Sequence, residues 1–288
     1  MKLRHLFFVS AVVLVGTLLV TAATAQKTRT KPTVAYNTIP GTLPGNVPSV
    51  GPEAYAFIEL GDGLGTFAPY TSTVGQVTVV LSSWACQSGT WQANCVSGNT
   101  AKFSQDITFN LYAVSGDSTS SGPYVVGAQL GSVTKTFSIP YRPSATPSKC
   151  SDASQWYSKQ DKTCYSGIAV PVMIDFSSLA IAMPANGLIA VTVAYNTSNY
   201  GPNPLGTSTA CYTANGGCPY DSLNISTYNP PSGSTNPGFP LDANGIFVSP
   251  TLNYAQCSGE LPLVPGSVQV DTGCWGFLHP EISLTVNK

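Results

Sequence analysis

Short runs of alternating apolar and polar residues recur along this chain and limit the folds it can adopt. Within residues 76–82, the apolar residues Val77, Val79 and Leu81 occupy every second position. This period of two places their side chains on one face of a β-strand. Trp84 departs from the alternation, which predicts that the strand ends just before it.

The same alternation returns in later segments, and no stretch of useful length shows a helical period of 3.6 residues. Further strands are predicted at residues 54–60, 107–113, 133–139, 168–176, 189–195, 246–248 and 282–286. Turns and long loops separate them, which favours an antiparallel β-sandwich, with jelly-roll topology as the first choice. Pro171 predicts a sheet edge or a bulge in its strand, and Lys135 predicts that its strand lies at a sheet edge. Turns are predicted at residues 61–63 and 186–187.

The first 25 residues read as a secretory signal peptide. Lys2 and Arg4 precede an apolar run, and small residues follow it up to Ala25, as at a signal-peptidase site. The run is shorter than the ~20 residues that a membrane-spanning helix needs. We therefore expect cleavage after Ala25, secretion to the extracellular space, and no membrane insertion of the mature chain.

The mature chain is predicted to form one domain. Residues 26–52 contain too many prolines for a regular element and are expected to form an extended N-terminal arm. Residues 53–288 are expected to form a single β-sandwich domain. Glycine, proline and small polar residues dominate residues 200–245, which predicts a long loop insertion with one short strand near 223–227.

The charge of the mature chain argues against nucleic acid as a partner. Removal of Lys2 and Arg4 leaves 10 basic and 13 acidic residues, a net charge of about −3. Only 9% of the residues are charged, against about a quarter in an average domain. No basic patch for a phosphate backbone is present in the sequence. The polar positions are filled instead by neutral hydroxyl and amide side chains.

The cysteines indicate an oxidising compartment. All eight lie after the signal peptide, and an even number in a secreted chain predicts four disulfides. Eight cysteines allow 105 pairings, so the sequence leaves the connectivity open. We favour sequential pairs because each would bracket a short polar loop: Cys86–Cys95, Cys150–Cys164, Cys211–Cys218 and Cys257–Cys274. A zinc site is disfavoured by the lack of a C-x₂-C pair.

Four segments resemble a family of uncharacterised secreted bacterial proteins. They are residues 77–86 (VTVVLSSWAC), 137–144 (FSIPYRPS), 194–202 (AYNTSNYGP) and 218–224 (CPYDSLN). The resemblance spans roughly residues 55–228 and implies secretion and a single conserved domain plan. The family has no assigned activity, so no catalytic residue is carried over from it.

The sequence contains no recognisable catalytic motif. His279 is the only histidine of the mature chain, no G-x-S-x-G motif surrounds a serine, and a two-histidine zinc motif is excluded. His279 precedes Pro280 at the start of the last strand, which favours a structural role. Paired carboxylates for glycoside hydrolysis remain an alternative among these acids: Glu53, Glu59, Asp62, Asp106, Asp175, Asp242, Glu260, Asp271 and Glu281.

Some of the acidic residues in turns could bind a structural calcium ion. The other interpretation is that these acidic side chains are simply solvated. Glu59 and Asp62, or Asp242 and Asn244, could each contribute oxygen ligands in a loop. Neither segment matches a defined calcium-binding loop such as the EF-hand. No cofactor is otherwise predicted.

The aromatic residues suggest a function in binding. All four tryptophans lie near cysteines, and Trp91, Trp156 and Tyr157 occupy polar surroundings. Exposed aromatic rings on rigid loops can stack against sugars, although such rings can equally cover disulfides. We expect a non-catalytic binding module for carbohydrate or another cell-envelope component. The alternatives are a structural or interaction protein of the cell surface or matrix, and a secreted hydrolase that uses paired carboxylates.

Overall fold

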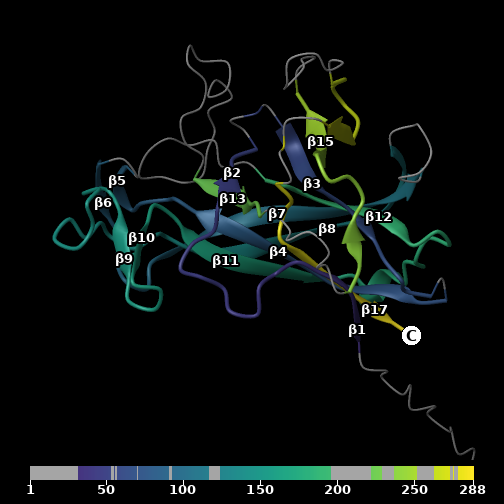
Figure 1. Ribbon diagram of the computed structural model, residues 1–288, viewed down its shortest axis with the longest axis horizontal. Helices are drawn as coiled ribbons and strands as arrows, with labels where there is room; N and C mark the ends of the chain where they lie inside the picture. Colours follow the sequence, from purple (N-terminus) through teal and green to yellow (C-terminus); the bar gives the residue numbers. More distant parts are fainter. Residues whose placement is uncertain are drawn as a thin grey trace, which may run out of the picture. The chain divides into compact units, whose positions relative to one another are not determined.

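A computed structural model describes residues 32–52, 55, 57–69, 71–90, 93–116, 124–195, 222–228, 237–251, 263–272, 275 and 278–288. The described chain is all-β, and every strand pair in it is antiparallel (Figure 1). The described part contains no α-helix, and the short 3-10 helix η2 (Ser177–Leu179) follows β11 (Ile168–Asp175). Two large sheets face each other across one hydrophobic core. The predicted all-β architecture with antiparallel sheets is therefore confirmed, and the two sheets are compatible with the predicted β-sandwich.

The first sheet, sheet A, is arranged around β4. It contains β1 (Thr33–Asn37), β2 (Ser49–Val50), β4 (Thr73–Ser83), β11 (Ile168–Asp175), β13 (Leu223–Ser226) and β17 (Ile282–Asn287). β11 pairs with one edge of β4, and β17 and β13 share the other edge. Pro171 lies in β11, whose one partner among the described strands is β4, so the predicted edge position is confirmed.

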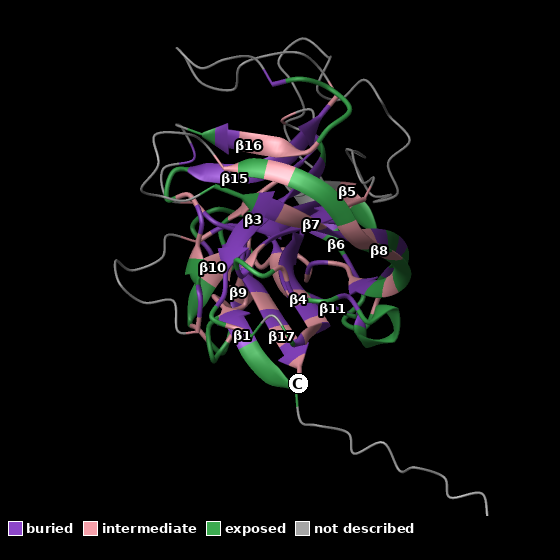
Figure 2. Cartoon of the chain, turned by 90° about the vertical axis from the view of Figure 1, so that its right-hand side faces the viewer, coloured by how far each residue is buried: buried purple, intermediate pink, exposed green. Residues whose placement is uncertain are grey.

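The second sheet, sheet B, has the order β16-β15-β3-β12-β7-β8, with β14 also paired to β3. Its strands are β3 (Phe57–Gly65), β7 (Lys102–Ser115), β8 (Val125–Pro140), β12 (Leu188–Ala194), β14 (Phe239–Pro240), β15 (Gly245–Pro250) and β16 (Gln269–Thr272). β8 lies at one end of this order, as Lys135 predicts. Figure 2 shows that much of β8 is exposed.

The core between the sheets follows the predicted alternation. Phe109 of β7 and Val191 of β12 are fully buried and belong to the same core cluster as Val79 of β4. The chain crosses between the sheets repeatedly, from β3 to β4, from β11 to β12 and from β12 to β13. Such crossings are typical of jelly-roll chains.

Two small hairpins carry the described disulfides. β5 (Ser88–Thr90) pairs with β6 (Ala93–Val96), and β9 (Trp156–Ser158) pairs with β10 (Thr163–Tyr165). Cys86–Cys95 and Cys150–Cys164 are bonded, as the sequential pairing predicts. The two hairpins lie near the same end of the sheets in Figure 1, and the Ala145 amide donates to the Cys95 carbonyl at 3.1 Å. Cys211, Cys218, Cys257 and Cys274 lie outside the described residues.

Two local predictions are wrong. Part of the expected N-terminal arm forms β1 and β2, and Tyr36 of β1 is fully buried. Edge strands tolerate the flanking prolines because half of their backbone groups need no partner. Residues 61–63 are predicted as a turn but lie inside β3. The glycines at alternate positions of this segment allow neighbouring groups to pack closely on the strand, so here they mark close packing and not a turn.

Most of the predicted long loop lies outside the described residues, although β13 falls where the short strand is predicted. Across the part of the chain that the structure covers, no helix has the length and apolar character needed to cross a membrane.

Candidate functional site

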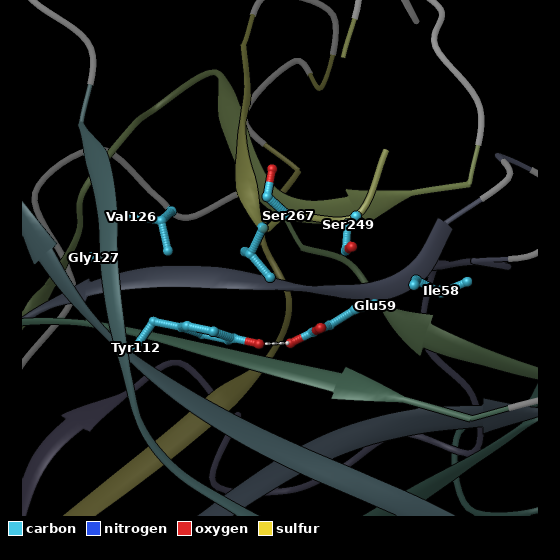
Figure 3. A pocket seen from close by; sticks show the side chains of 9 residues that line it. Ile58, Glu59, Tyr112, Val126, Gly127, Ser249 and Ser267 are labelled. Atoms are coloured by element: carbon cyan, nitrogen blue, oxygen red, sulfur yellow. Dashed lines mark hydrogen bonds between the residues drawn. The ribbon is translucent and has the colours of Figure 1, made fainter. Parts of the chain in front are cut away.

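The outer face of sheet B carries a pocket of about 400 Å³. Val126 and Gly127 of β8 line one side, and Ser267 and Val268, just before β16, line the other. β8 and β16 are opposite ends of the sheet, so the sheet must curl to bring them to one pocket. The remaining lining residues are Ile58, Glu59, Tyr112, Ser249 and Gly266, several of which are seen in Figure 3.

A hydrogen-bonded carboxylate lies at the base of this pocket. Glu59 is 8% exposed, and its Oε1 accepts hydrogen bonds from Nδ2 of Asn110 at 2.8 Å and from the Tyr112 hydroxyl at 2.9 Å. The Thr192 hydroxyl donates to the same oxygen. Figure 3 shows the Tyr112 hydroxyl directed at Glu59. Strands β3, β7 and β12 thus hold one carboxylate in a fixed position.

Neighbouring groups fix the donors in turn. Nε2 of Gln129, on β8, donates to Oδ1 of Asn110 at 3.0 Å, which turns the amide nitrogen of Asn110 toward Glu59. Burial, and then the charge of Glu59, raises the pKa of Tyr112. The Tyr112 hydroxyl therefore stays protonated near neutral pH and remains a donor. The network spans four strands of sheet B.

Glycines of β3 shape the floor beside Glu59. The positions of Gly61 and Gly63 share the outer face with Glu59 because strand side chains alternate. A Cβ atom on Gly63 would lie 2.3 Å from the ring of Phe247, and one on Gly61 would lie 1.9 Å from the Val191 carbonyl. Only glycine permits these close approaches. Phe247 covers this face and belongs to a second apolar cluster.

The lining of the pocket suits a hydroxyl-rich ligand. Glu59 and the hydroxyls of Ser249 and Ser267 offer hydrogen bonds, while Ile58, Tyr112, Val126 and Val268 offer apolar contacts. A few fixed polar groups within an apolar lining are typical of small-molecule sites. Glu59 is the one carboxylate among the lining residues, so the pocket lacks the pair that glycoside hydrolysis needs.

A second polar group of residues lies inside the sandwich. Asp62, on the inner face of β3, is fully buried, and its Oδ2 lies 2.9 Å from Nδ1 of His279. Burial by itself lowers the pKa of His279, but the Asp62 carboxylate outweighs this and raises it. Burial raises the pKa of Asp62 despite the histidine. His279 has no exposed surface, which agrees with a structural role.

Further polar side chains surround this buried pair. Tyr228 and His279 exchange two backbone hydrogen bonds of 2.9 Å. Burial, and then the charge of Asp62, raises the pKa of Tyr36, and burial raises that of Tyr228 to about 12. Burial also raises the pKa of Glu281 to about 7. Tyr36, Asp62, His279 and Glu281 are buried in this cluster, and Tyr228 is half-buried.

The structure does not bring the sequence-predicted aromatic residues together. Trp156 is buried, and its Nε1 donates to the Gly167 carbonyl at 2.7 Å. Tyr157 points to the opposite face of β9, where Lys149 Nζ lies 5.2 Å from its ring centroid. Trp156 and Tyr157 therefore cannot form one stacking platform. Trp91 lies outside the described residues.

The acids proposed as calcium ligands are also separated. Glu59 lies on the outer face of sheet B and Asp62 on the inner face, so they cannot bind the same ion. Oδ1 of Asp242 accepts a hydrogen bond from the Asn244 amide at 2.9 Å within a turn. Among the described residues, no three histidine, cysteine or acidic side chains are grouped to hold a metal.

Sequence reasoning missed the pocket as a site, although it named Glu59 as a candidate acid. One usable signal was present. Asn110, Tyr112 and Thr192 lie on the face of their strands that the alternation assigns to solvent, yet Asn110 and Thr192 are buried. A set of polar residues on neighbouring strands can thus mark a covered polar network.

Comparison of the chain with protein-family models, with curated proteins and with solved structures gives no match.

Proposed function

We propose that this protein is a secreted, non-catalytic binding module that takes a carbohydrate, or another hydroxyl-rich component of the cell envelope, into the Glu59 pocket. The observation that carries the proposal is the fixed carboxylate at the base of a partly apolar pocket. Donors and acceptors that are already positioned lose little entropy when a ligand binds.

The shape of the lining supports a sugar over a purely apolar ligand. Burying Glu59 under an apolar group would remove its remaining contact with water without replacement, and this costs free energy. A sugar ring supplies hydroxyl donors for Glu59 and partners for Ser249 and Ser267. Its C–H groups can lie against Tyr112 and Val126, in the manner of aromatic sugar contacts.

Secretion is part of this proposal. Two features support it: the signal-like residues 1–25 of the sequence, and the Cys86–Cys95 and Cys150–Cys164 disulfides, which persist in oxidising compartments. Mass spectrometry of the protein from culture medium tests it. A mature N-terminus at Gln26 is expected, and retention of an intact N-terminus inside the cell would contradict it.

A glycan-array screen of the mature protein tests the binding function. Ser267 is exposed at the pocket rim, so Ser267→Trp should block the pocket without disturbing the core. Ser178→Trp, at an exposed position of η2, is the matched control. We expect Ser267→Trp to abolish the signal and Ser178→Trp to retain it. Equal glycan binding by both variants would place the ligand elsewhere.

One observation favours the second candidate, an interaction protein of the cell surface or matrix. β8 is 16 residues long, is largely exposed, and pairs with β7 as its one strand partner in the described structure. Such an edge can add a strand from another chain. Sedimentation of the mature protein with and without Val133→Pro tests this. Association that proline abolishes would support the interaction protein.

A further inference from the structure

We infer that the Glu59 pocket selects an amino sugar with a free, protonated amine over a neutral or N-acetylated sugar. The inference rests on the proposed function, because it names the ligand class of the same pocket. It follows from the hydrogen bonds made by the two oxygens of the Glu59 carboxylate and from the charges around them.

The two oxygens of Glu59 have different surroundings. Oε1 accepts hydrogen bonds from Asn110, Tyr112 and Thr192. Oε2 has no hydrogen-bond donor among the described residues. All three donors to Oε1 come from the sheet beneath the pocket, on β7 and β12. The oxygen that is left for a ligand is therefore Oε2.

The charge of Glu59 has no cationic partner in the described structure. None of the nine lining residues is basic, and the ion pair between Asp62 and His279 does not include Glu59. The donors on Oε1 are neutral groups. Buried charges in proteins are normally paired, and Glu59 is only 8% exposed. A cationic group on the ligand would supply the missing partner.

The geometry distinguishes a primary amine from other cations. A guanidinium binds a carboxylate best through both oxygens, but three protein donors already occupy Oε1. A quaternary ammonium donates no hydrogen bond and needs an aromatic cage, whereas Tyr112 is the one aromatic ring of the lining. Calcium needs six to eight oxygen ligands. A protonated primary amine needs one free oxygen, which Oε2 supplies.

The remaining lining favours a sugar as the carrier of that amine over a lysine side chain. Ser249 and Ser267 lie at the side of the pocket opposite Tyr112 and Val126 and present hydroxyl groups (Figure 3). Ring hydroxyls of a sugar can bond to both serines while the amine meets Glu59. The alkyl chain of a lysine would leave these two serines without ligand partners.

Isothermal titration of the mature protein with three matched tetrasaccharides tests the inference: β-1,4-linked glucosamine, its N-acetylated form, and the glucose equivalent. A charge-assisted hydrogen bond in a partly buried site predicts at least about tenfold tighter binding of the free-amine form. Acetylation removes the charge, so this comparison needs no protein variant. A lysine tripeptide serves as the alternative amine.

The Glu59→Gln variant, titrated with the same three sugars, is the second part of the test. The amide oxygen of glutamine can still accept from Asn110, Tyr112 and Thr192, while its NH₂ group replaces Oε2 and repels an ammonium. We expect this variant to bind the three sugars within about twofold of one another. Thr108→Ala, on the same sheet face but outside the lining, is the control and should keep the preference. A thermal melt establishes that both variants are folded.

The outcomes separate the two proposals. Equal binding of the amine and N-acetyl forms, or an amine preference that survives in Glu59→Gln, would overturn the inference while leaving sugar binding intact. Binding of the lysine tripeptide as tightly as the amino sugar would also overturn it. If no sugar binds the wild-type protein, the proposed function itself fails.

Discussion

Asp62 and His279 join the two sheets of the sandwich through a 2.9 Å contact inside the core. Asp62 belongs to β3 of sheet B, and His279 lies three residues before the start of β17 of sheet A. Both side chains are fully buried, so each depends on the other to compensate the loss of water. Two residues that are 217 positions apart in the chain thus form one cross-sheet connection.

Breaking this pair should be strongly destabilising. Asp62→Ala leaves the imidazole of His279 buried without its partner, and such losses cost about 3–5 kcal/mol. We expect Asp62→Ala and His279→Ala each to lower the free energy of unfolding by this amount. The double variant should cost less than the sum of the two, as denaturant titrations can measure. Strict additivity would contradict a direct coupling.

Stability should be higher in mild acid than at neutral pH. Burial raises the pKa of Glu281 from its usual 4.5 to about 7, so the folded state binds a proton that the unfolded chain releases. The free energy of unfolding therefore falls as pH rises through this window, by up to about 3 kcal/mol. The raised pKa values of Asp62 and His279 act in the same direction.

Glu281→Gln tests the contribution of that one group. Glutamine does not titrate, so the slope of the free energy of unfolding between pH 4.5 and pH 7 should become shallower. Denaturant melts at half-unit pH steps measure the slope. An unchanged slope would show that Glu281 titrates normally in the folded protein.

The two faces of sheet B should respond differently to truncation. Phe109→Ala removes a fully buried ring of the core and should cost about 3–5 kcal/mol. Thr108→Ala, at a partly exposed position where the hydroxyl bonds to Thr134, should stay within about 0.5 kcal/mol.

Thr192→Ala should cost more than Thr108→Ala, although strand alternation places both side chains on the outer face of sheet B. Thr192 is fully buried and donates to Glu59. Loss of this donor weakens a buried polar network, at about 1–3 kcal/mol. Chemical denaturation of both variants measures the difference. Equal small decreases in the free energy of unfolding would mean that Thr192 is exposed to solvent on the outer face.

The described disulfides should stabilise hairpins more than the core. Each closes a short loop, with separations of 9 and 14 residues, and such closures contribute about 2–3 kcal/mol each. Non-reducing peptide mapping should recover the Cys86–Cys95 and Cys150–Cys164 links. The same map tests the sequential pairing of the other four cysteines. A peptide that joins Cys95 to Cys150 would refute local pairing.

Trp156 should matter for stability and not for binding. Its ring is buried and its indole N–H is bonded to Gly167, so Trp156→Phe should destabilise the protein by about 1–3 kcal/mol through the lost hydrogen bond and volume. Glycan affinity should be unchanged, because Trp156 is not in the pocket lining. If the variant lost glycan affinity while its stability was unchanged, Trp156 would be a ligand-binding residue.

Features that depend on neighbouring residues in the chain could be predicted from the sequence. The alternation of Val77, Val79 and Leu81 requires a strand with one buried face, and β4 buries all three. Pro171 and Lys135 indicated edge strands because an edge tolerates a missing amide or a charge. Local bracketing of polar loops predicted the two described disulfides, since short loops keep their ends close.

The burial of polar residues could not be predicted from the sequence, because it depends on long-range contacts. Asn110 and Thr192 have the period of solvent-facing positions, yet the curl of sheet B covers them and directs them to Glu59. The residues that line the pocket come from positions as far apart in the chain as 58 and 268. A local sequence pattern cannot predict contacts between residues so distant in the chain. A period of two assigns a side chain to one face of a strand, but sheet curvature and long-range pairing decide whether that face meets water.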